Sequence, residues 1–266
     1  MSPQFVDFDA DGRLDLVAGT FDGSPHVAFG TMDGWKQPVQ ILDAKGERIV
    51  LNQFYDFDEK AWDETKRCDP TDPALKHGHG TSAYAWDWDA DGDLDLLLGD
   101  YSSGQLFLRR NDGKPSTARF VGTNELVLAG GKPLDVGDLA TPRVVDWDRD
   151  GLPDLVVSSM GSHGPEGGGV YFFRNTGKRG APEFAAPVTL LAPPSEPSDA
   201  LAERPISGLY VDAADFDRDG DLDLLVGAYS HLAGKPAAEN RVPAVWLYEN
   251  RTAAPSKPGE PAARGR

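Results

Sequence analysis

Short apolar stretches alternate with polar turns along most of the chain, and the same order of stretches recurs four times. In each unit a brief apolar stretch precedes an acidic turn, and a longer one follows it. Such runs, bounded by Gly, Pro, Asn and Asp, are typical of β-strands, and no segment of useful length has the period of an amphipathic helix. The four longer stretches are Leu16–Ala18, Leu96–Leu98, Leu155–Val157 and Leu224–Val226.

Each unit continues with further strands, which makes it a small antiparallel meander. A third strand is clearest at Gln105–Leu108, Val170–Phe173 and Val245–Tyr248. A fourth follows in units one to three, near Val39–Leu42, Glu125–Leu128 and Val188–Leu191. Repeated four-stranded meanders are the blades of a β-propeller. We therefore predict an all-β fold, a β-propeller of four-stranded antiparallel blades over residues 1–250, with units beginning near residues 3, 82, 141 and 210.

The last unit differs from the other three. After Asn250 no fourth strand is visible, and residues 251–266 are rich in Ala, Pro and Gly. A segment of that composition cannot bury enough apolar surface to fold. The sequence therefore predicts a disordered C-terminal tail and a propeller that is partial or open.

The acidic turn that separates the first two strands of each unit has a fixed pattern, Asp-x-Asp-x-Asp-Gly-x-x-Asp-Leu. Its four copies begin at Asp7, Asp87, Asp146 and Asp215. An aromatic residue follows the first Asp every time, as Phe8, Trp88, Trp147 and Phe216. One such string can arise by chance in an acidic chain, but four in register cannot.

This pattern supplies a cage of hard oxygen ligands. The carboxylates at loop positions 1, 3, 5 and 9 can converge, Gly at position 6 allows a sharp turn, and the backbone carbonyl at position 7 adds a further oxygen. Six or seven oxygens in a flexible loop favour Ca²⁺ over Mg²⁺, and without thiolate or imidazole the loops suit Zn²⁺ and Cu²⁺ poorly. We predict about four Ca²⁺ ions, held by Asp7, Asp9, Asp11, Arg13 and Asp15; Asp87, Asp89, Asp91, Asp93 and Asp95; Asp146, Asp148, Asp150, Leu152 and Asp154; and Asp215, Asp217, Asp219, Asp221 and Asp223.

Other interpretations of the loops fit less well. An EF-hand needs a bidentate Glu at position 12, where this chain has Ala18, Leu98, Val157 and Val226. Dockerin-like repeats need flanking helices. If the loops were merely solvated acidic turns, converging carboxylates ~4 Å apart would repel by about 4 kcal/mol per pair at an effective dielectric constant of ~20. The folded state is therefore expected to depend strongly on structural, non-catalytic calcium.

The motif and the following Asp223–Tyr229 segment resemble the FG-GAP/VCBS repeat family, and the resemblance covers roughly residues 3–250. The resemblance implies calcium-binding β-propellers, such as the head of integrin α subunits and many bacterial surface proteins. Such propellers usually have about seven blades. Four visible units therefore predict a piece of a longer propeller or an open four-blade arc, more readily than a closed four-blade ring.

Composition and charge narrow the class of partner and the compartment. The formal net charge of −17 disfavours nucleic acid and anionic membranes, and no apolar run is long enough to span a bilayer. The single Cys68 excludes an internal disulfide. Residues 1–4 do not resemble a signal peptide. Cages of modest affinity nevertheless suit millimolar calcium, and we expect an extracellular, periplasmic or cell-surface location.

The loops opposite the acidic turns are the longer ones, and they gather residues that could bind a protein or glycan ligand. The irregular insertions span residues 52–80, 158–169 and 228–243, and residues 192–207 form a further connection on that face. His77 and His79 could also form a metal site with Cys68. The candidate ligand-face residues are Trp62, His77, His79, Tyr101, His163, Tyr229 and His231.

The leading functional prediction is a non-catalytic, calcium-stabilised binding or adhesion module for a protein or glycan. An alternative is a carbohydrate-active enzyme, such as a polysaccharide lyase or hydrolase, on the same scaffold, because the fold alone does not decide function. No Gly-x-Ser-x-Gly elbow, His-Glu-x-x-His helix or phosphate-binding Gly loop is present, and no catalytic residue is predicted. A third alternative is a purely structural segment of a large adhesin.

Overall fold

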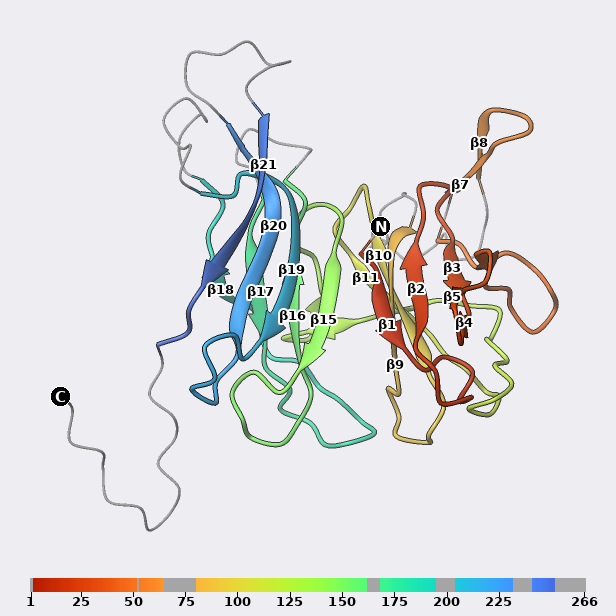
Figure 1. Ribbon diagram of the computed structural model, residues 1–266, viewed down its shortest axis with the longest axis horizontal. Helices are drawn as coiled ribbons and strands as arrows, with labels where there is room; N and C mark the ends of the chain where they lie inside the picture. Colours follow the sequence, from red (N-terminus) through yellow and green to blue (C-terminus); the bar gives the residue numbers. More distant parts are fainter. Residues whose placement is uncertain are drawn as a thin grey trace.

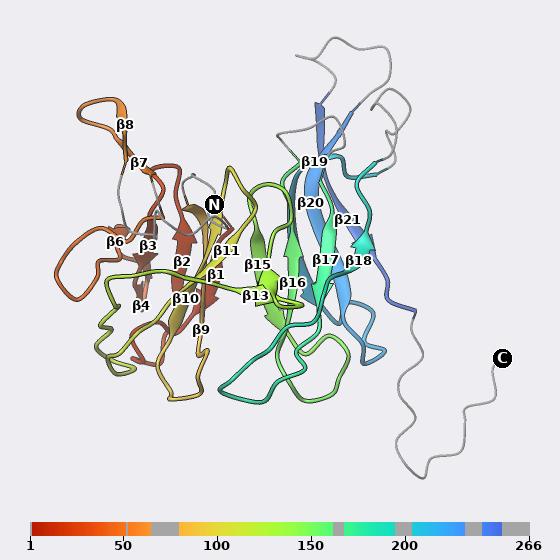
Figure 2. The same cartoon turned by 180° about the vertical axis from the view of Figure 1, so that it is seen from behind.

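The computed structural model describes residues 2–51, 53–64, 80–161, 168–194, 204–231 and 241–251. Every regular element in these ranges is a β-strand, and the strands form four main antiparallel sheets. The sheets lie side by side in chain order along the long axis of the molecule, with the first and the fourth at opposite ends (Figures 1 and 2). The prediction of an all-β propeller with four blades is confirmed.

Each main sheet is a meander in which neighbouring strands follow one another along the chain. The first contains β1 (Gln4–Val6), β2 (Asp15–Gly19), β3 (Pro25–Ala28) and β6 (Val39–Gln40). The second contains β9 (Gly80–Trp86), β10 (Asp95–Asp100), β11 (Leu106–Arg109) and β12 (Glu125–Leu126). The third contains β15 (Thr141–Val145), β16 (Asp154–Ser158), β17 (Val170–Phe173) and β18 (Val188–Leu191). The fourth contains β19 (Ser207–Ala214), β20 (Asp223–His231) and β21 (Arg241–Tyr248), and within the described residues it has no fourth strand.

Three two-stranded hairpins complete the described strands. They are β4 (Gly30–Thr31) with β5 (Gly34–Trp35), β7 (Gln53–Asp56) with β8 (Ala61–Glu64), and β13 (Leu128–Ala129) with β14 (Lys132–Pro133). The β7–β8 hairpin falls in the segment 52–80, which we expected to be an irregular insertion. That expectation was wrong for this part, because Phe54 and Tyr55 pair across the hairpin with Asp63 and Trp62.

The hydrophobic core is divided into three clusters, one between each pair of consecutive sheets. Successive residues of a strand point to opposite faces, so the second strands of the two middle sheets, β10 and β16, each contribute to two clusters. In β10, Leu96 and Leu98 pack toward the first sheet, whereas Leu97 packs toward the third. In β16, Leu155 and Val157 pack toward the second sheet and Val156 toward the fourth. This alternation explains why β10 and β16 are apolar at successive positions, as a strand buried on both faces must be.

The innermost strands of all four sheets surround an open cavity of about 1030 Å³. Its lining is largely apolar and includes Phe5, Tyr84 and Tyr210. Arg143 crosses this region: its Nε donates to Oδ1 of Asp212 at 3.3 Å, and its Nη1 donates to Oγ of Ser2 at 2.8 Å. The guanidinium therefore links the first, third and fourth sheets near the centre of the arc.

Candidate metal centres

All four acidic motifs lie in the loops that join the first strand of a sheet to the second, so they share one edge of the molecule, the lower one in Figure 1. Each loop takes the same backbone course. The residue at position 4 has a positive φ in every copy: Ala10 (57°), Ala90 (62°), Arg149 (62°) and Arg218 (66°). The glycine at position 6 has φ between 87° and 96° in all four. These two left-handed residues are separated by a single residue, and together they turn the chain back tightly enough to bring the carboxylates together.

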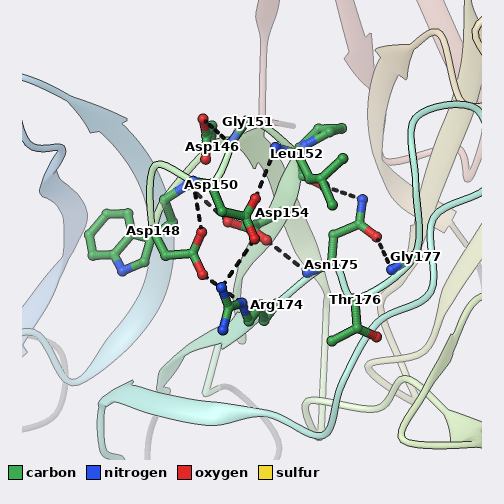
Figure 3. Close-up of polar contacts among 12 residues, drawn as sticks. Asp146, Asp148, Asp150, Gly151, Leu152, Asp154, Arg174, Asn175, Thr176 and Gly177 are labelled. Atoms are coloured by element: carbon green, nitrogen blue, oxygen red, sulfur yellow. Dashed lines mark hydrogen bonds and ion pairs between the residues drawn. The ribbon is translucent and has the colours of Figure 1, made fainter. Parts of the chain in front are cut away.

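Side-chain carboxylates hold this turn through backbone amides. In the first three copies the Asp at position 1 accepts from the amide of the glycine at position 6, as Asp7 does from Gly12 at 3.0 Å. The Asp at position 5 accepts from the amide at position 7, as Asp150 does from Leu152 at 3.0 Å (Figure 3). The loop therefore forms an acceptor-lined hollow whose shape is set by its own main chain.

The Asp at position 9 has a second role that sequence reasoning missed. One oxygen accepts from the amide of the aromatic residue at position 2, and the other accepts from an amide just beyond the third strand. For Asp154 these donors are Trp147 at 3.0 Å and Asn175 at 2.7 Å. Asp15, Asp95 and Asp223 make the same pair of bonds. This carboxylate fastens each acidic loop to the third strand of its own sheet.

Each loop brings carboxylate oxygens close enough to share one ion. In every copy, three Asp residues offer one oxygen each within 4.8 Å of one another. The groups are Asp7, Asp9 and Asp15; Asp87, Asp89 and Asp91; Asp146, Asp148 and Asp154; and Asp215, Asp217 and Asp219. These twelve residues all belong to the predicted ligand set.

Three carboxylate oxygens in these loops are buried and have no hydrogen-bond donor: Oδ1 of Asp93, of Asp146 and of Asp221. Buried polar atoms in proteins are nearly always paired, so an orphaned anionic oxygen needs a cation or water to satisfy it. Sequence reasoning gave Asp93 and Asp221 only a backbone role at position 7. Their side chains therefore add an unpaired carboxylate oxygen each to the second and fourth loops.

The electrostatics of the loops also favour a bound cation. Burial raises the pKa of Asp95 and of Asp154 to about 6, against the bonds from backbone amides. Burial, together with the charges of Asp91, Asp89 and Asp87, raises the pKa of Asp93 to about 6. In the fourth sheet, by contrast, the amide of Asn250 lowers the pKa of Asp223. Ionising these carboxyl groups in the second and third loops therefore costs free energy unless a positive charge is near.

In the second and third sheets, an arginine that follows the third strand supplies part of that positive charge. Arg174, which follows β17, places Nε 2.6 Å from Oδ2 of Asp148 and Nη2 3.1 Å from Oδ2 of Asp150 (Figure 3). Arg110 occupies the corresponding place in the second sheet, with Nη1 3.2 Å from Oδ2 of Asp89. The corresponding positions in the first and fourth sheets are Phe29 and Glu249.

Comparison with known families agrees with this architecture. A model of the FG-GAP-like repeat matches residues 87–157 and again residues 146–226, which together make up more than half of the chain. The chain belongs to the FG-GAP-like repeat family. The matches contain the second, third and fourth acidic loops. A search of curated proteins finds no match.

Membership of the FG-GAP-like family bears on what the four acidic loops bind and where such proteins are found. FG-GAP repeats often bind Ca²⁺, are typical of extracellular proteins, and together with a propeller fold suggest a binding module. The first loop lies outside the matched residues, yet its Asp15 accepts the same pair of backbone bonds as its equivalents in the other three. In the described part of the chain, no helix has the length and apolarity needed to cross a membrane.

The predicted ligand face is described only in part. His77, His79, His163 and Cys68 lie outside the described residues, as do residues 252–266 of the predicted tail, and of the side chain of His231 nothing is described. Tyr101 and Tyr229 both lie near Tyr210, whose pKa is raised by burial and by these two neighbours. Tyr210 was not among the predicted ligand-face residues.

Trp62 belongs to an aromatic cluster that sequence reasoning also missed. Its ring lies 5.8 Å from that of Phe21 and 5.3 Å from that of Tyr55, and the ring of Phe57 lies 5.0 Å from Tyr55. These four residues, hereafter the aromatic cluster, come from the β2–β3 loop and from the β7–β8 hairpin, which projects from the edge opposite the acidic loops (Figure 1). Phe21, Phe57 and Trp62 are exposed. The signal in the sequence was the density of aromatic residues in 54–62.

Proposed function

We propose that this protein is a calcium-stabilised extracellular binding module. Its four acidic loops hold Ca²⁺ along one edge, and the opposite edge binds a glycan or protein ligand. The observation that carries the calcium part is the set of orphaned buried oxygens on Asp93, Asp146 and Asp221, each of which belongs to an acidic loop that also holds a cluster of three carboxylates. Burying a carboxylate oxygen away from water costs free energy unless a positive charge or a hydrogen-bond donor compensates it.

The donor set fits calcium better than other common ions. The clustered side chains are all carboxylates, which are hard oxygen donors, and the loops are short and held by their own amides. In each loop the carboxylates at positions 1, 3, 5 and 9 and the carbonyl at position 7 would hold the ion. A bound Ca²⁺ would supply positive charge that offsets the repulsion among these groups. The chain's own residues orient the cage, because the carboxylate at position 9 is already fixed to the third strand.

Calcium titration tests this part of the proposal. Protein stripped of divalent ions is titrated with CaCl₂ in a calorimeter, and its melting temperature is followed in parallel. About four ions should bind, and the melting temperature should rise as the ligand stabilises the folded state. Asp146→Asn should remove one site, whereas the control Asp33→Asn, an exposed acid in the β4–β5 turn, should leave all four. Absence of both heat and melting shift would contradict the proposal.

The ligand part is supported by the aromatic cluster. Partly exposed rings that already pack edge to face present apolar surface in a fixed arrangement, and aromatic residues are the commonest anchors of binding interfaces. Rings of this kind also stack on the apolar faces of sugars. The cluster lies on a hairpin, away from the acidic loops, so occupation of one edge does not obstruct the other.

A glycan array, followed by titration of any hit, tests the ligand part. Trp62→Ala should weaken binding at least tenfold. Trp35→Ala is a matched control, because Trp35 is also exposed but donates from Nε1 to the carbonyl of Leu14 in the first acidic loop. If no glycan binds, the same pair of variants is tested on protein ligands captured from extracellular matrix extracts. Equal loss in both variants would contradict a role for the aromatic cluster.

A further inference from the structure

The first and fourth sheets each have an exposed apolar face at an end of the molecule. These two faces correspond to the two sides of the contact between consecutive sheets, hereafter the joint, which occurs three times within the chain. We call the side of a sheet that faces the next sheet in chain order its forward face, and the other side its backward face. Each hydrophobic cluster joins the forward face of one sheet to the backward face of the next. The forward face of the fourth sheet and the backward face of the first have no such neighbour among the described residues.

Strand register identifies the corresponding positions. Leu106, Val170 and Val245 occupy the same place in the third strands of their sheets, each paired with the residue four after the motif's last Asp. Leu106 and Val170 are 0% exposed, whereas Val245 is 71% exposed. Leu108, Phe172 and Leu247 are the next equivalent set, and again only the member in the fourth sheet, at 37%, is exposed.

The aromatic position of the motif follows the same rule. Phe8 is buried against the second sheet, and Trp88 and Trp147 pack against the second and third clusters. Phe216, the equivalent residue of the fourth sheet, is 61% exposed. The forward face of the fourth sheet therefore has the same residue types as the three buried forward faces, and it differs from them in having no cover among the described residues.

The backward face of the first sheet is the complementary half. Phe5 pairs with Leu16 across β1 and β2, as Ala85 pairs with Leu96 in the second sheet. Ala85 and Leu96 are buried in the first cluster, but Phe5 is 58% exposed and Leu16 only partly covered. Phe5 packs against Trp35, also exposed, with ring centroids 5.7 Å apart.

We propose that two copies of this chain associate head to tail, with the forward face of each fourth sheet on the backward face of the partner's first sheet. The two joints are identical and related by a two-fold axis, the commonest symmetry of soluble oligomers. Together they close a ring of eight blades, which lies within the range of known propellers. The open cavity beside Phe5 and Tyr210 becomes part of the central channel of that ring.

Sedimentation velocity and light scattering on the calcium-loaded chain at micromolar concentration test this association. The wild-type protein should have twice the mass of the 28.6 kDa chain. Val245→Asp and Phe5→Lys should each give a monomer, with association weakened about a hundredfold, because a charge would be buried in both joints. Val188→Asp is the matched control: Val188 is exposed on β18, at neither end face, and its variant should remain a dimer.

Mixing the two monomeric variants gives a sharper test. In a mixed pair, one joint carries both substitutions and the other is entirely wild type, so the mixture should regain association that neither variant has alone. Contact between two fourth sheets, or between two first sheets, predicts no such recovery. A monomeric wild-type chain, a Val245→Asp variant that still dimerises, or a mixture that stays monomeric overturns the proposal. Circular dichroism confirms that each variant is folded before it is scored.

Discussion

Arg109 and Asp43 form an ion pair that is withdrawn from solvent, with Nη2 and Oδ2 3.5 Å apart and both side chains at most 1% exposed. Arg109 is the last residue of β11, and Asp43 follows β6, so the pair joins the first sheet to the second beside the first hydrophobic cluster. Asp43 is held in place by the amides of Lys45 and Glu47, each 2.9 Å from Oδ1. Arg109 also donates from Nη1 to Asn124.

Arg109→Met should destabilise the protein strongly, because it leaves the Asp43 carboxylate buried without its counter-charge. Loss of one partner of a buried pair typically costs about 3–5 kcal/mol. Urea unfolding, followed by fluorescence, measures the change. Arg110→Met, one residue along and on the surface, is the matched control and should cost under about 1 kcal/mol. Equal costs for the two variants would show that burial of the pair has no energetic consequence.

Asp154→Asn should weaken the protein even in calcium-free buffer, because Asp154 fastens the acidic loop to the third strand. An amide oxygen can replace one of its two acceptor roles, but the amide nitrogen then faces a backbone donor. A cost of about 2–4 kcal/mol follows from bonds to a charged acceptor. Asp150→Asn is the matched control, since its Oδ1 contact with Leu152 survives the substitution and the ion pair it loses, with Arg174, is largely exposed and contributes little to stability. Chemical denaturation without calcium should separate the two variants, and similar values would argue against the fastening role.

Stability without calcium should increase as the pH falls from about 7 to about 5. The folded-state pKa of Asp95 and of Asp154 is about 6, against an ordinary value of 3.8, so the folded state binds more protons than the unfolded state in this window. The stabilisation is complete below the unfolded pKa and is lost as the pH rises through 6. With saturating calcium the trend should reverse, because protons then compete with the ion. Melting temperatures across the pH range test both trends, and a calcium-free protein that melts lower at the acid end would contradict the first.

Substitutions at the two left-handed loop positions should have opposite signs. Ala10 has φ 57° and is exposed, so Ala10→Asn, a residue that tolerates this region, should stabilise the protein by up to about 1 kcal/mol. Gly12 has φ 87° and open space where a Cβ would stand, so Gly12→Ala should cost about 1 kcal/mol through backbone strain alone. Thermal unfolding in calcium-free buffer measures both. The same sign for both variants would show that the loop does not keep this backbone course in solution.

The repeats made the architecture predictable from sequence. Strand identity followed from apolar runs on either side of a motif with fixed spacing, and the second strands of the two middle sheets, β10 and β16, are apolar because both of their faces are buried. The β7–β8 hairpin was not predicted, because its residues, such as Asp56 and Asp58, are polar and lie in a long connection where loop and strand patterns look alike.

The site was predictable in its ligand types and less so in the details of its geometry. Spacing identified the carboxylates that converge, but not that Asp154 and its equivalents are shared with the third strand, since that contact joins residues far apart in sequence. The ion pair between Arg110, which follows the third strand of the second sheet, and Asp89 of the second acidic loop was likewise not predictable from spacing. The aromatic cluster joins Phe21 to Trp62 through packing between two separate loops. Contacts of this kind follow from the fold and have no local signature.

Each hydrophobic cluster is made from the same register positions of two successive sheets, and this has an evolutionary consequence. A blade inserted, deleted or duplicated as a whole meets neighbours whose faces already match it, so the number of blades can change in one genetic step without redesign of a core. The acidic loop travels with its blade, because its fastening to the third strand is internal to the sheet. Arrays of different length can therefore arise from one ancestral unit, each new blade bringing its own set of carboxylates.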